Sequence, residues 1–558
     1  MENKYSIYNE VSNLRQLLLA SAKLHSESIA FQYRDGDEMV RKSFSLFCHD
    51  VASFGTALLK RGYGSGKHIV IFSENNYEFI VVAFAIISSA STFIPVDKEV
   101  TAEGLYSALN YADCDMLIYS DTYHDLVETL INPASNTTFV NMQCKRSGAI
   151  SFSDLIIQGS SYLSHGDTIF FDCSLDNQST AAIFFTSGTT GNIKGAMHTH
   201  AGLTAYVKSM LETIDFGLES ILLLPLYHAA GFIGVLLYQV ARGGTMTLPK
   251  SVRYLSEDLL CFRPTYLVVV PLIIEMLYIR VLEKIKSSRK ERMYQWMMKL
   301  STILLFVGID LRNFFFKDIR ATLGGKLKII GTGGAPLDKR YIEAFCSIGI
   351  DIITAYGLTE CACFVTCNQP AYYRESSLGT VLPSFQIMID KDTDSDEGEI
   401  LVRGAPVMSG YYKNPDTNEV IFTDGWFHTG DIGRLSTDGY LYVTGRIRNI
   451  IKGSNGKNIY PEELEVLLSS ISYIQEAVVY NNQVVVNGVV EIVAEIFPNM
   501  EMFDASDEDS IRTILQQEID RVNRTLPLYK RIHHYEIRTS AFVKTGSTKI
   551  IRNGHNAQ

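Results

Sequence analysis

A loop rich in glycine, serine and threonine, with a single lysine, directly follows a short apolar run, and this junction limits the possible folds of the chain more than any other feature. The apolar run is Ala181–Phe185 (AAIFF), and the loop is Thr186–Gly195 (TSGTTGNIKG). A short apolar run that ends at turn-forming residues predicts a buried strand. Glycines let consecutive backbone N–H groups turn toward one point, while hydroxyls and a lysine add donors and positive charge. The junction therefore predicts a polyphosphate site at the end of a strand in an α/β protein.

The spacing of the loop differs from that of the two common nucleotide-binding motifs. In a Walker A loop the lysine directly follows the second glycine, whereas here Lys194 comes three residues after Gly191. The dinucleotide fingerprint G-x-G-x-x-G does not fit Gly188 and Gly191 either. A surface turn is the alternative interpretation, because loops of this composition are common. In a phosphate site, the residues of the loop that supply the donors are Thr186, Ser187, Gly188, Thr189, Thr190, Gly191 and Lys194.

Length and charge narrow the class of protein. A chain of 558 residues exceeds the usual size of one hydrophobic core, so two or more domains are expected. The formal net charge of −11 argues against nucleic acid as a partner. The polar N-terminus predicts no secretory signal, and nine scattered cysteines without a C-x-x-C pair fit a reducing compartment. We therefore expect a cytoplasmic globular protein.

Two apolar features favour a buried structural role. The stretch Phe79–Val96 contains four serine or threonine residues, so it predicts a buried helix followed by a strand rather than a membrane span. Cys361, Cys363 and Cys367 form the tightest cysteine group, and no histidine lies nearby in the sequence. They indicate small apolar residues on a strand rather than a metal site.

Short apolar runs alternate with longer amphipathic segments over most of the chain, as in largely parallel sheets covered by helices. After about Asp390 short alternating strands follow, and the last hundred or so residues form a compact α+β set. The predicted fold class is α/β, with a large N-terminal domain of layered, mostly parallel sheets, a small β-rich subdomain and a small α+β C-terminal domain. The predicted domains are 1–445 and 446–558. The predicted parallel strands include Ile69–Phe72, Met116–Tyr119, Ile221–Leu224, Tyr266–Val270 and Lys328–Ile330.

Further segments carry residue types suited to nucleotide chemistry. A tyrosine ring can stack on adenine, a threonine hydroxyl can meet a phosphate, and a carboxylate can hold Mg²⁺. The segments are LPLYHAAG at Leu224–Gly231, GTGGAPL at Gly331–Leu337, YGLTE at Tyr356–Glu360, WFHTGD at Trp426–Asp431, GR at Gly445–Arg446 and KTGSTKIIR at Lys544–Arg552.

With the loop T-S-G-T-T-G-x-x-K-G, these segments resemble, in the same order, the motifs of the adenylate-forming superfamily of AMP-binding enzymes. The resemblance covers nearly the whole chain and is closest to long-chain fatty acyl-CoA synthetases. It implies catalytic roles for four residues: Lys549, Thr359, Glu360 and His228, with Glu360 as the ligand of Mg²⁺. It implies that ATP is bound by the loop and by Gly333, Gly334, Ala335, Tyr356, Gly357, Asp431 and Arg446.

Several positions depart from the family pattern. Ile193 stands where proline is usual, and Thr548 stands where most members have a glycine before the lysine. Arg448 occupies the hinge position about which the small, mobile C-terminal domain turns, where the family has Asp or Lys. Lys544 is the rival of Lys549 for the catalytic role.

The resemblance implies that a carboxylate and ATP form an acyl-adenylate, which a thiol then converts into a thioester. The segment Tyr227–Val235 has no acidic residue, whereas amino-acid-activating domains generally carry an aspartate there. Small residues around Gly231 and Cys363 suit a tunnel for an alkyl chain, so the expected acid is a medium- or long-chain fatty acid. The acceptor is CoA or, alternatively, the phosphopantetheine of a carrier protein. A luciferase-like oxygenase or an inactive binding protein is the alternative of another class.

The segment 276–321 looks like the long insertion of long-chain acyl-CoA synthetases. It combines basic residues such as Arg280 and Lys284 with Trp296 and with the apolar run Ile303–Val307. Basic, aromatic and amphipathic segments of this kind can lie on an anionic bilayer. The sequence leaves two interpretations, weak peripheral membrane contact and a solvated helix packed on the core.

Overall fold

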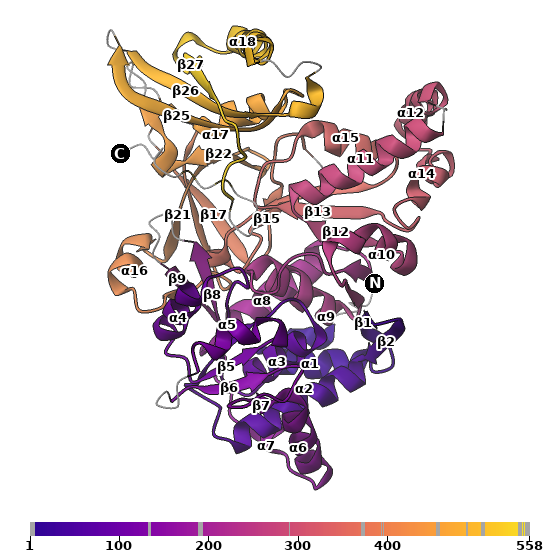
Figure 1. The fold of residues 1–558 in the computed structure, drawn as a ribbon, viewed down its shortest axis with the longest axis vertical. Coiled ribbons are helices and arrows are strands. Elements are labelled where there is room, and N and C mark those ends of the chain that lie inside the picture. The colour runs from indigo at the N-terminus through magenta and orange to yellow at the C-terminus, as the bar shows by residue number, and fades with distance from the viewer. Residues whose placement is uncertain are drawn as a thin grey trace.

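The structure is a computed structural model. It describes residues 6–131, 136–187, 193–288, 291–369, 374–391, 393, 395–452, 458–486, 489–503, 508–544, 550 and 552. The chain forms two large mixed sheets, a smaller antiparallel sheet and a C-terminal unit, which lies at the top of Figure 1. This arrangement confirms the predicted fold class.

The first large sheet has eight strands in the order β19-β9-β8-β4-β3-β5-β6-β7. Its strands are parallel from β8 to β7, whereas β9 pairs antiparallel with both β8 and β19. The strand β9, which follows the predicted phosphate loop, was not predicted, and it pairs antiparallel with β8. The strands are β3 (His68–Phe72), β4 (Thr92–Pro95), β5 (Met116–Tyr119), β6 (Thr138–Asn141), β7 (Ile150–Ser151), β8 (Thr180–Ser187), β9 (Ile193–Thr199) and β19 (Gly410–Tyr411).

The second large sheet has nine strands in the order β16-β15-β14-β13-β12-β10-β11-β1-β2. It is parallel from β14 to β1 and antiparallel at both edges. The predicted strand Ile221–Leu224 was misplaced, because β10 starts at Glu219 and ends at Ile221, and the chain then runs to Pro225, which has no N–H for a ladder. The strands are β1 (Ile29–Asp35), β2 (Glu38–Ser43), β10 (Glu219–Ile221), β11 (Thr245–Leu248), β12 (Tyr266–Val269), β13 (Ile329–Gly333), β14 (Asp351–Tyr356), β15 (Thr366–Cys367) and β16 (Thr380–Val381).

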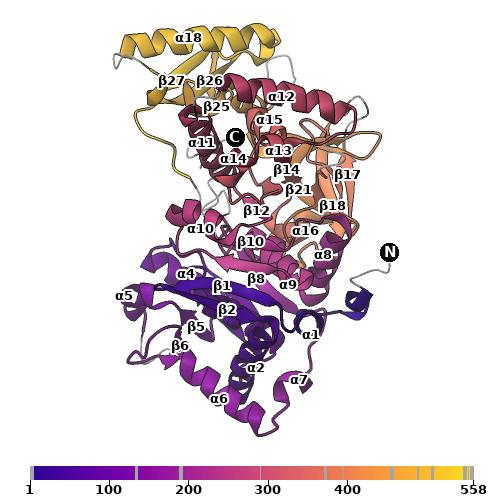
Figure 2. The same ribbon diagram turned by 90° about the vertical axis from the view of Figure 1, so that its right-hand side faces the viewer.

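Helices cover these two sheets (Figures 1 and 2). Several of them begin at a short polar residue whose side chain accepts a backbone N–H of the first turn, as Asn76 does for Phe79 and Thr199 for Gly202. The stretch predicted as a buried helix and strand forms α3 and β4, in which every residue except Glu78 is buried. The helices are α1 (Leu14–Leu24), α2 (Phe44–Lys60), α3 (Tyr77–Ser88), α4 (Ala102–Tyr111), α5 (His124–Glu128), α6 (Phe152–Ser164), α7 (Ile169–Asp172), α8 (His200–Thr213), α9 (Tyr238–Arg242), α10 (Leu255–Phe262), α11 (Pro271–Ser287), α12 (Glu291–Phe306), α13 (Arg312–Phe315), α14 (Lys317–Ala321) and α15 (Lys339–Ser347).

The β-rich part is an antiparallel sheet, β17-β18-β21-β20, with β22 paired to β21. Burial alternates along β17, where Phe385 is buried and Gln386 is exposed, as expected of a sheet with one covered face. Its elements are β17 (Phe385–Asp390), β18 (Gly398–Gly404), α16 (Pro415–Ile421), β20 (Phe422–Thr423), β21 (Trp426–Leu435) and β22 (Leu441–Arg446).

The C-terminal unit has its own apolar core, which extends from Ile451 to Ile532 along the chain. The predicted domain boundary at residue 445 precedes this core and stays a prediction. Among the helices that the structure describes, none is both long and apolar enough to cross a membrane. The elements of the unit are β23 (Ile451–Lys452), β24 (Asn458–Ile459), α17 (Pro461–Ser469), β25 (Ile474–Val486), β26 (Val489–Pro498), α18 (Glu508–Thr525) and β27 (His534–Ile537).

Candidate active site

The hairpin of β8 and β9 holds both ends of the predicted phosphate loop. Thr186 and Lys194 lie opposite each other in its register, and the Thr186 hydroxyl donates to the Lys194 carbonyl oxygen at 3.4 Å. Ser187 closes β8, opposite Ile193. Gly188, Thr189, Thr190 and Gly191 lie outside the described residues. The pairing places Lys194, the one lysine of the loop, in β9, one residue after the start of the strand.

A cavity of about 420 Å³ lies beside this hairpin. Two of the predicted site residues, Lys194 and Glu360, line it although they are far apart in the sequence. Its apolar wall is Leu358, Val420, Ile421 and Phe427, and its polar wall is Lys194, Glu360, Glu399, Tyr411, His428, Thr429 and Gly430. A lysine and carboxylates around one cavity suit a phosphate and a divalent cation.

The sequence did not single out Tyr411, which connects these two residues. Its hydroxyl donates to Glu360 Oε1 at 2.6 Å, and Lys194 Nζ lies 5.1 Å from the centroid of its ring. Glu360 belongs to a short 3-10 turn, Thr359–Cys361, that follows β14. Burial and the nearby Glu360 carboxylate raise the pKa of Tyr411, so its phenol stays protonated and acts as a donor.

A second group of predicted residues meets at Asp431, which is only 4% exposed. Tyr356 donates its hydroxyl to Asp431 Oδ2 at 2.8 Å, and Arg446 Nε lies 3.0 Å from Asp431 Oδ1. Asp431 and Arg446 are directly opposite each other in the pairing of β21 with β22. Burial, together with Asp431, raises the pKa of Tyr356 well above its usual range. The three predicted nucleotide-binding residues are therefore one connected group.

The predicted glycines lie at the ends of β13 and β14. Gly333 is opposite Ala355 in the pairing of these strands, and Gly334 has a φ of +81°, in the region that glycine adopts most readily. Gly357 packs so closely on the next loop that a Cβ there would lie 1.6 Å from the Cys363 carbonyl oxygen. Ala335 follows Gly334 and is half-buried. Gly357 is thus explained by close packing, and its contact with ATP stays a prediction.

His228 lies in the loop between β10 and a π-helix, Ala230–Leu237. Its ring centroid is 4.6 Å from that of Tyr227, and Asn75 holds the loop by donating to the Leu224 carbonyl and accepting from the Leu226 N–H. Thr359 follows Leu358 in the turn that carries Glu360. His228 and Thr359 are half-buried and do not line the 420 Å³ cavity, so their catalytic roles stay predictions.

Glu399 and His428 form a further pair in the cavity wall that the sequence did not single out. His428 Nδ1 lies 2.8 Å from Glu399 Oε2, and the Gly430 N–H donates to Glu399 Oε1 at 2.9 Å. The pair joins β18 to β21, directly before Asp431. The segment WFHTGD pointed to this region, but the partner Glu399 comes from another strand.

Of the two candidate catalytic lysines near the C-terminus, Lys544 and Lys549, the structure describes only Lys544. Lys544 Nζ pairs with Glu476 Oε1 at 2.6 Å, and the Phe542 N–H donates to the other oxygen of this carboxylate at 2.8 Å. Lys549 lies outside the described residues. The predicted hinge residue Arg448 is exposed in a 3-10 turn that follows β22. Lys544 therefore has an ion-pair partner, and the catalytic role of Lys549 stays a prediction.

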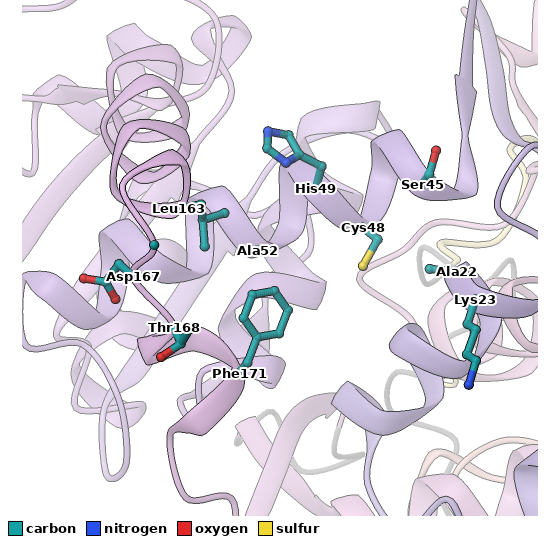
Figure 3. A pocket seen from close by; sticks show the side chains of 11 residues that line it. Ala22, Lys23, Ser45, Cys48, His49, Ala52, Leu163, Asp167, Thr168 and Phe171 are labelled. Carbon is teal, nitrogen blue, oxygen red and sulfur yellow. The ribbon is translucent and has the colours of Figure 1, made fainter.

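A larger cavity, of about 540 Å³, lies away from all of these residues (Figure 3). It is bounded by α1, α2 and the connection from α6 to α7, with Cys48, Leu163 and Phe171 among its lining side chains. Burial raises the pKa of the Cys48 thiol to about 11, so this thiol is not a ready nucleophile. The smaller cavity is the better candidate site because it brings phosphate-binding residue types together.

Comparisons with known proteins agree with this choice. The sequence family described as AMP-binding enzyme matches residues 18–412. The Long-chain-fatty-acid--CoA ligase FadD15 of Mycobacterium bovis is 28% identical over 452 residues, which cover 77% of this chain and 74% of the relative. The Long-chain-fatty-acid--[acyl-carrier-protein] ligase AEE15, chloroplastic, of Arabidopsis thaliana is 24% identical over 585 residues, which cover 90% of this chain and 78% of the relative.

Among solved structures, the fold is similar to that of O-succinylbenzoate Coenzyme A Synthetase (MenE) from Bacillus subtilis, in complex with ATP and magnesium ion. The TM-score is 0.72 at 21% identity, and the alignment covers 97% of this chain and 98% of the other. The match to the AMP-binding family spans more than half of the chain and includes both Lys194 and Glu360. On this match, the protein belongs to the AMP-binding enzyme family.

Proposed function

We propose that this protein activates a carboxylic acid with ATP to form an acyl-adenylate and then transfers the acyl group to a thiol. An AMP-forming acid–thiol ligase that uses ATP, Mg²⁺ and CoA agrees with the family and with the named activities of the relatives. The observation that carries the proposal is the meeting of Lys194 and Glu360 in one cavity, which is also lined by β21, the strand that carries Asp431.

In the first step, a carboxylate oxygen attacks the α-phosphorus of ATP, the bond to the bridging oxygen breaks, and pyrophosphate leaves. The reactants are both anions, so catalysis depends on positioning and charge neutralisation. Lys194, which lines the cavity, is proposed to hold the departing phosphates, and the carboxylate of Asp431 is proposed to accept from the ribose hydroxyls. Lys549 is proposed to neutralise the α-phosphate and the attacking carboxylate. The thiol then attacks the acyl carbon, AMP leaves, and the thiol proton is released.

Magnesium, when bound, supplies further charge neutralisation for the phosphates. Glu360 fits the role of its ligand, because its carboxylate lines the cavity with Lys194 and Mg²⁺ prefers oxygen ligands. One oxygen of this carboxylate accepts from Tyr411, and a carboxylate has lone pairs for more than one partner.

We propose a medium- or long-chain fatty acid as the substrate and CoA as the acceptor. The M. bovis relative is named for both, and the segment Tyr227–Val235 has no acid that would bind an amino group. A carrier-protein thiol is the second candidate, because the A. thaliana relative is named for that acceptor. The glycines of the proposed acyl tunnel pack closely in the structure, since a Cβ on Gly234 would lie 2.6 Å from Cys363 Sγ. The tunnel therefore stays a prediction.

Pyrophosphate release with a panel of fatty, aromatic and amino acids tests this function. We expect release with a fatty acid and ATP, and a thioester only when CoA or a phosphopantetheinylated carrier protein is added. Separate reactions with CoA and with the carrier protein show which of the two thiols accepts the acyl group. Release with none of the acids would contradict the ligase function.

We further propose that the region of α12 makes weak peripheral contact with an anionic membrane. Large apolar side chains are exposed there, with Trp296 of α12 63% and Phe314 of α13 77% exposed, and Lys299 of α12 is exposed as well. In Figure 1 α12 lies at the edge of the molecule. Apolar side chains flanked by basic ones suit an anionic bilayer, in which fatty acids partition. Other exposed apolar residues of this region are Met293, Ile303, Leu305, Val307, Ile309 and Leu311.

A vesicle-binding assay checks this contact. With vesicles of equal parts phosphatidylcholine and phosphatidylglycerol, we expect the double variant Trp296→Ser/Phe314→Ser to bind at least about tenfold more weakly than the wild type. Leu528→Ser is the control, because Leu528 is 74% exposed on the C-terminal unit. Equal binding of all three proteins would show that α12 is a solvated helix instead.

A further inference from the structure

Tyr411 contacts both Lys194 and Glu360 in the proposed phosphate site, and none of the sequence motifs assigns it a role. It reaches the site because β19 pairs antiparallel with β9, which places Tyr411 opposite Ala196, two residues from Lys194. The same segment is attached to the turn of Glu360, because the Met408 N–H donates to the Glu360 carbonyl oxygen at 2.8 Å. Tyr411 is therefore carried on a strand that is bonded to both elements.

The backbone of Tyr411 is fixed by a second partner. Asn418 accepts the Tyr411 N–H at 2.7 Å and donates to the Tyr411 carbonyl oxygen at 2.9 Å. Gly410 makes this possible, because a Cβ there would lie 2.8 Å from Asn418 Nδ2 and its φ of +137° favours glycine. The side chain of Tyr411 is only 8% exposed. A side chain held in this way has its geometry set before a ligand arrives.

The hydroxyl and the ring of Tyr411 each contact one charged residue of the site. Its hydroxyl donates to Glu360 Oε1 at 2.6 Å, a hydrogen bond to a charged acceptor that fixes the orientation of the carboxylate. Its ring lies under Lys194 Nζ, 5.1 Å away, where the π-face attracts the ammonium group. All three side chains line the 420 Å³ cavity.

We propose that Tyr411 is a positioning residue for Mg·ATP: its hydroxyl orients the Glu360 carboxylate toward the cation, and its ring holds Lys194 toward the phosphates. The inference rests on the proposed function, in which these two residues bind the cation and the phosphates. Tyr411 itself takes no part in bond making or breaking.

The next residue provides a matched control. Tyr412 lies in the turn after β19, where its hydroxyl donates to Asp113 Oδ2 at 2.7 Å and Lys413 Nζ lies 5.3 Å from its ring centroid. Tyr412 thus has the same kinds of partner, a carboxylate and a lysine, but it does not line the cavity. Tyr411→Phe and Tyr412→Phe each remove one hydroxyl and keep the ring.

The test measures binding of α,β-methylene-ATP by calorimetry, with and without Mg²⁺, alongside KM and kcat for Mg·ATP. We expect Tyr411→Phe to reduce the Mg²⁺-dependent part of the affinity roughly tenfold, the size expected for one hydrogen bond to a charged group. KM for Mg·ATP should rise more than kcat falls, and excess Mg²⁺ should restore activity. Tyr412→Phe should bind like the wild type, and Tyr411→Leu should also weaken binding without Mg²⁺, because Lys194 loses its support.

Glu360→Gln separates the inference from the function on which it rests. If Glu360→Gln lowers the Mg²⁺ dependence and Tyr411→Phe does not, the role of Tyr411 is wrong and the site stands. If neither variant changes the Mg²⁺ dependence, both the cation role of Glu360 and the inference are wrong. If Tyr411→Phe lowers binding equally with and without Mg²⁺, or if excess Mg²⁺ gives no rescue, its effect is structural and the inference is also wrong.

Discussion

A Lys549→Met variant is expected to form acyl-adenylate about a hundred- to a thousandfold more slowly than the wild type, the usual effect of removing one charged donor from a transition state. The lysine is proposed to act on the α-phosphate and the attacking carboxylate, which react only in the first step. The second step starts from acyl-adenylate, so thioester formation from supplied acyl-AMP should be retained. Pyrophosphate release and thioester formation are measured separately.

Lys544→Met is the matched control for this prediction. Lys544 pairs with Glu476, whose side chain is largely buried, so its loss leaves a carboxylate without that partner and lowers stability by about 1–3 kcal/mol. Any loss of activity should therefore affect both steps equally and follow the fraction of folded protein. A selective loss of adenylation in Lys544→Met would transfer the catalytic role to Lys544. Equal loss of both steps in Lys549→Met would contradict its assigned role.

Gly357→Ala is expected to prevent normal folding of the site region. A Cβ at this position would lie 1.6 Å from the Cys363 carbonyl oxygen and 2.7 Å from Phe364 Cα, and both are backbone atoms that cannot rotate away. We expect a cost above about 4 kcal/mol, in the range of severe core overpacking. Soluble yield and thermal unfolding, followed by intrinsic fluorescence, measure it.

Gly331→Ala, on the neighbouring strand β13, gives the comparison. There the nearest atom to a Cβ is Val268 Cγ2 at 3.4 Å, an ordinary contact, so we expect a change within about 1 kcal/mol. Comparing the two variants distinguishes the effect of close packing at Gly357 from a general loss of stability on replacing a glycine of this region with alanine. If the two variants unfold at the same temperature, the close approach of Gly357 to Cys363 does not constrain the fold.

Much of the fold was predictable because its signals are local. Apolar runs of a few residues gave β3, β5 and β12 close to their observed bounds, since a buried strand needs only its own apolar residues to be recognised. The buried helix α3 and strand β4 were separable by the serines between them. The prediction of a strand through Leu224 was wrong, because an apolar run does not show where its pairing partner ends.

The candidate site was predictable only in part. The order of the motifs pointed to Lys194, Glu360 and Asp431, which are charged residues of the candidate site. The contacts of their neighbours were not predictable, because Tyr411 meets Glu360 across 51 residues of chain and Tyr356 meets Asp431 across 75. Glu399 was missed for the same reason, since its partner His428 lies on another strand.

The sequence by itself indicated the family and the alternation of strands and helices, and it predicted the phosphate loop and the acidic residue proposed for Mg²⁺. These follow from residue types at short spacing, which need no knowledge of the rest of the chain. Only the tertiary structure decided that β9 turns back antiparallel on β8 and that β19 brings Tyr411 between Lys194 and Glu360. Strand pairing and its register are set by contacts between distant segments, and these contacts decide which side chains share a cavity.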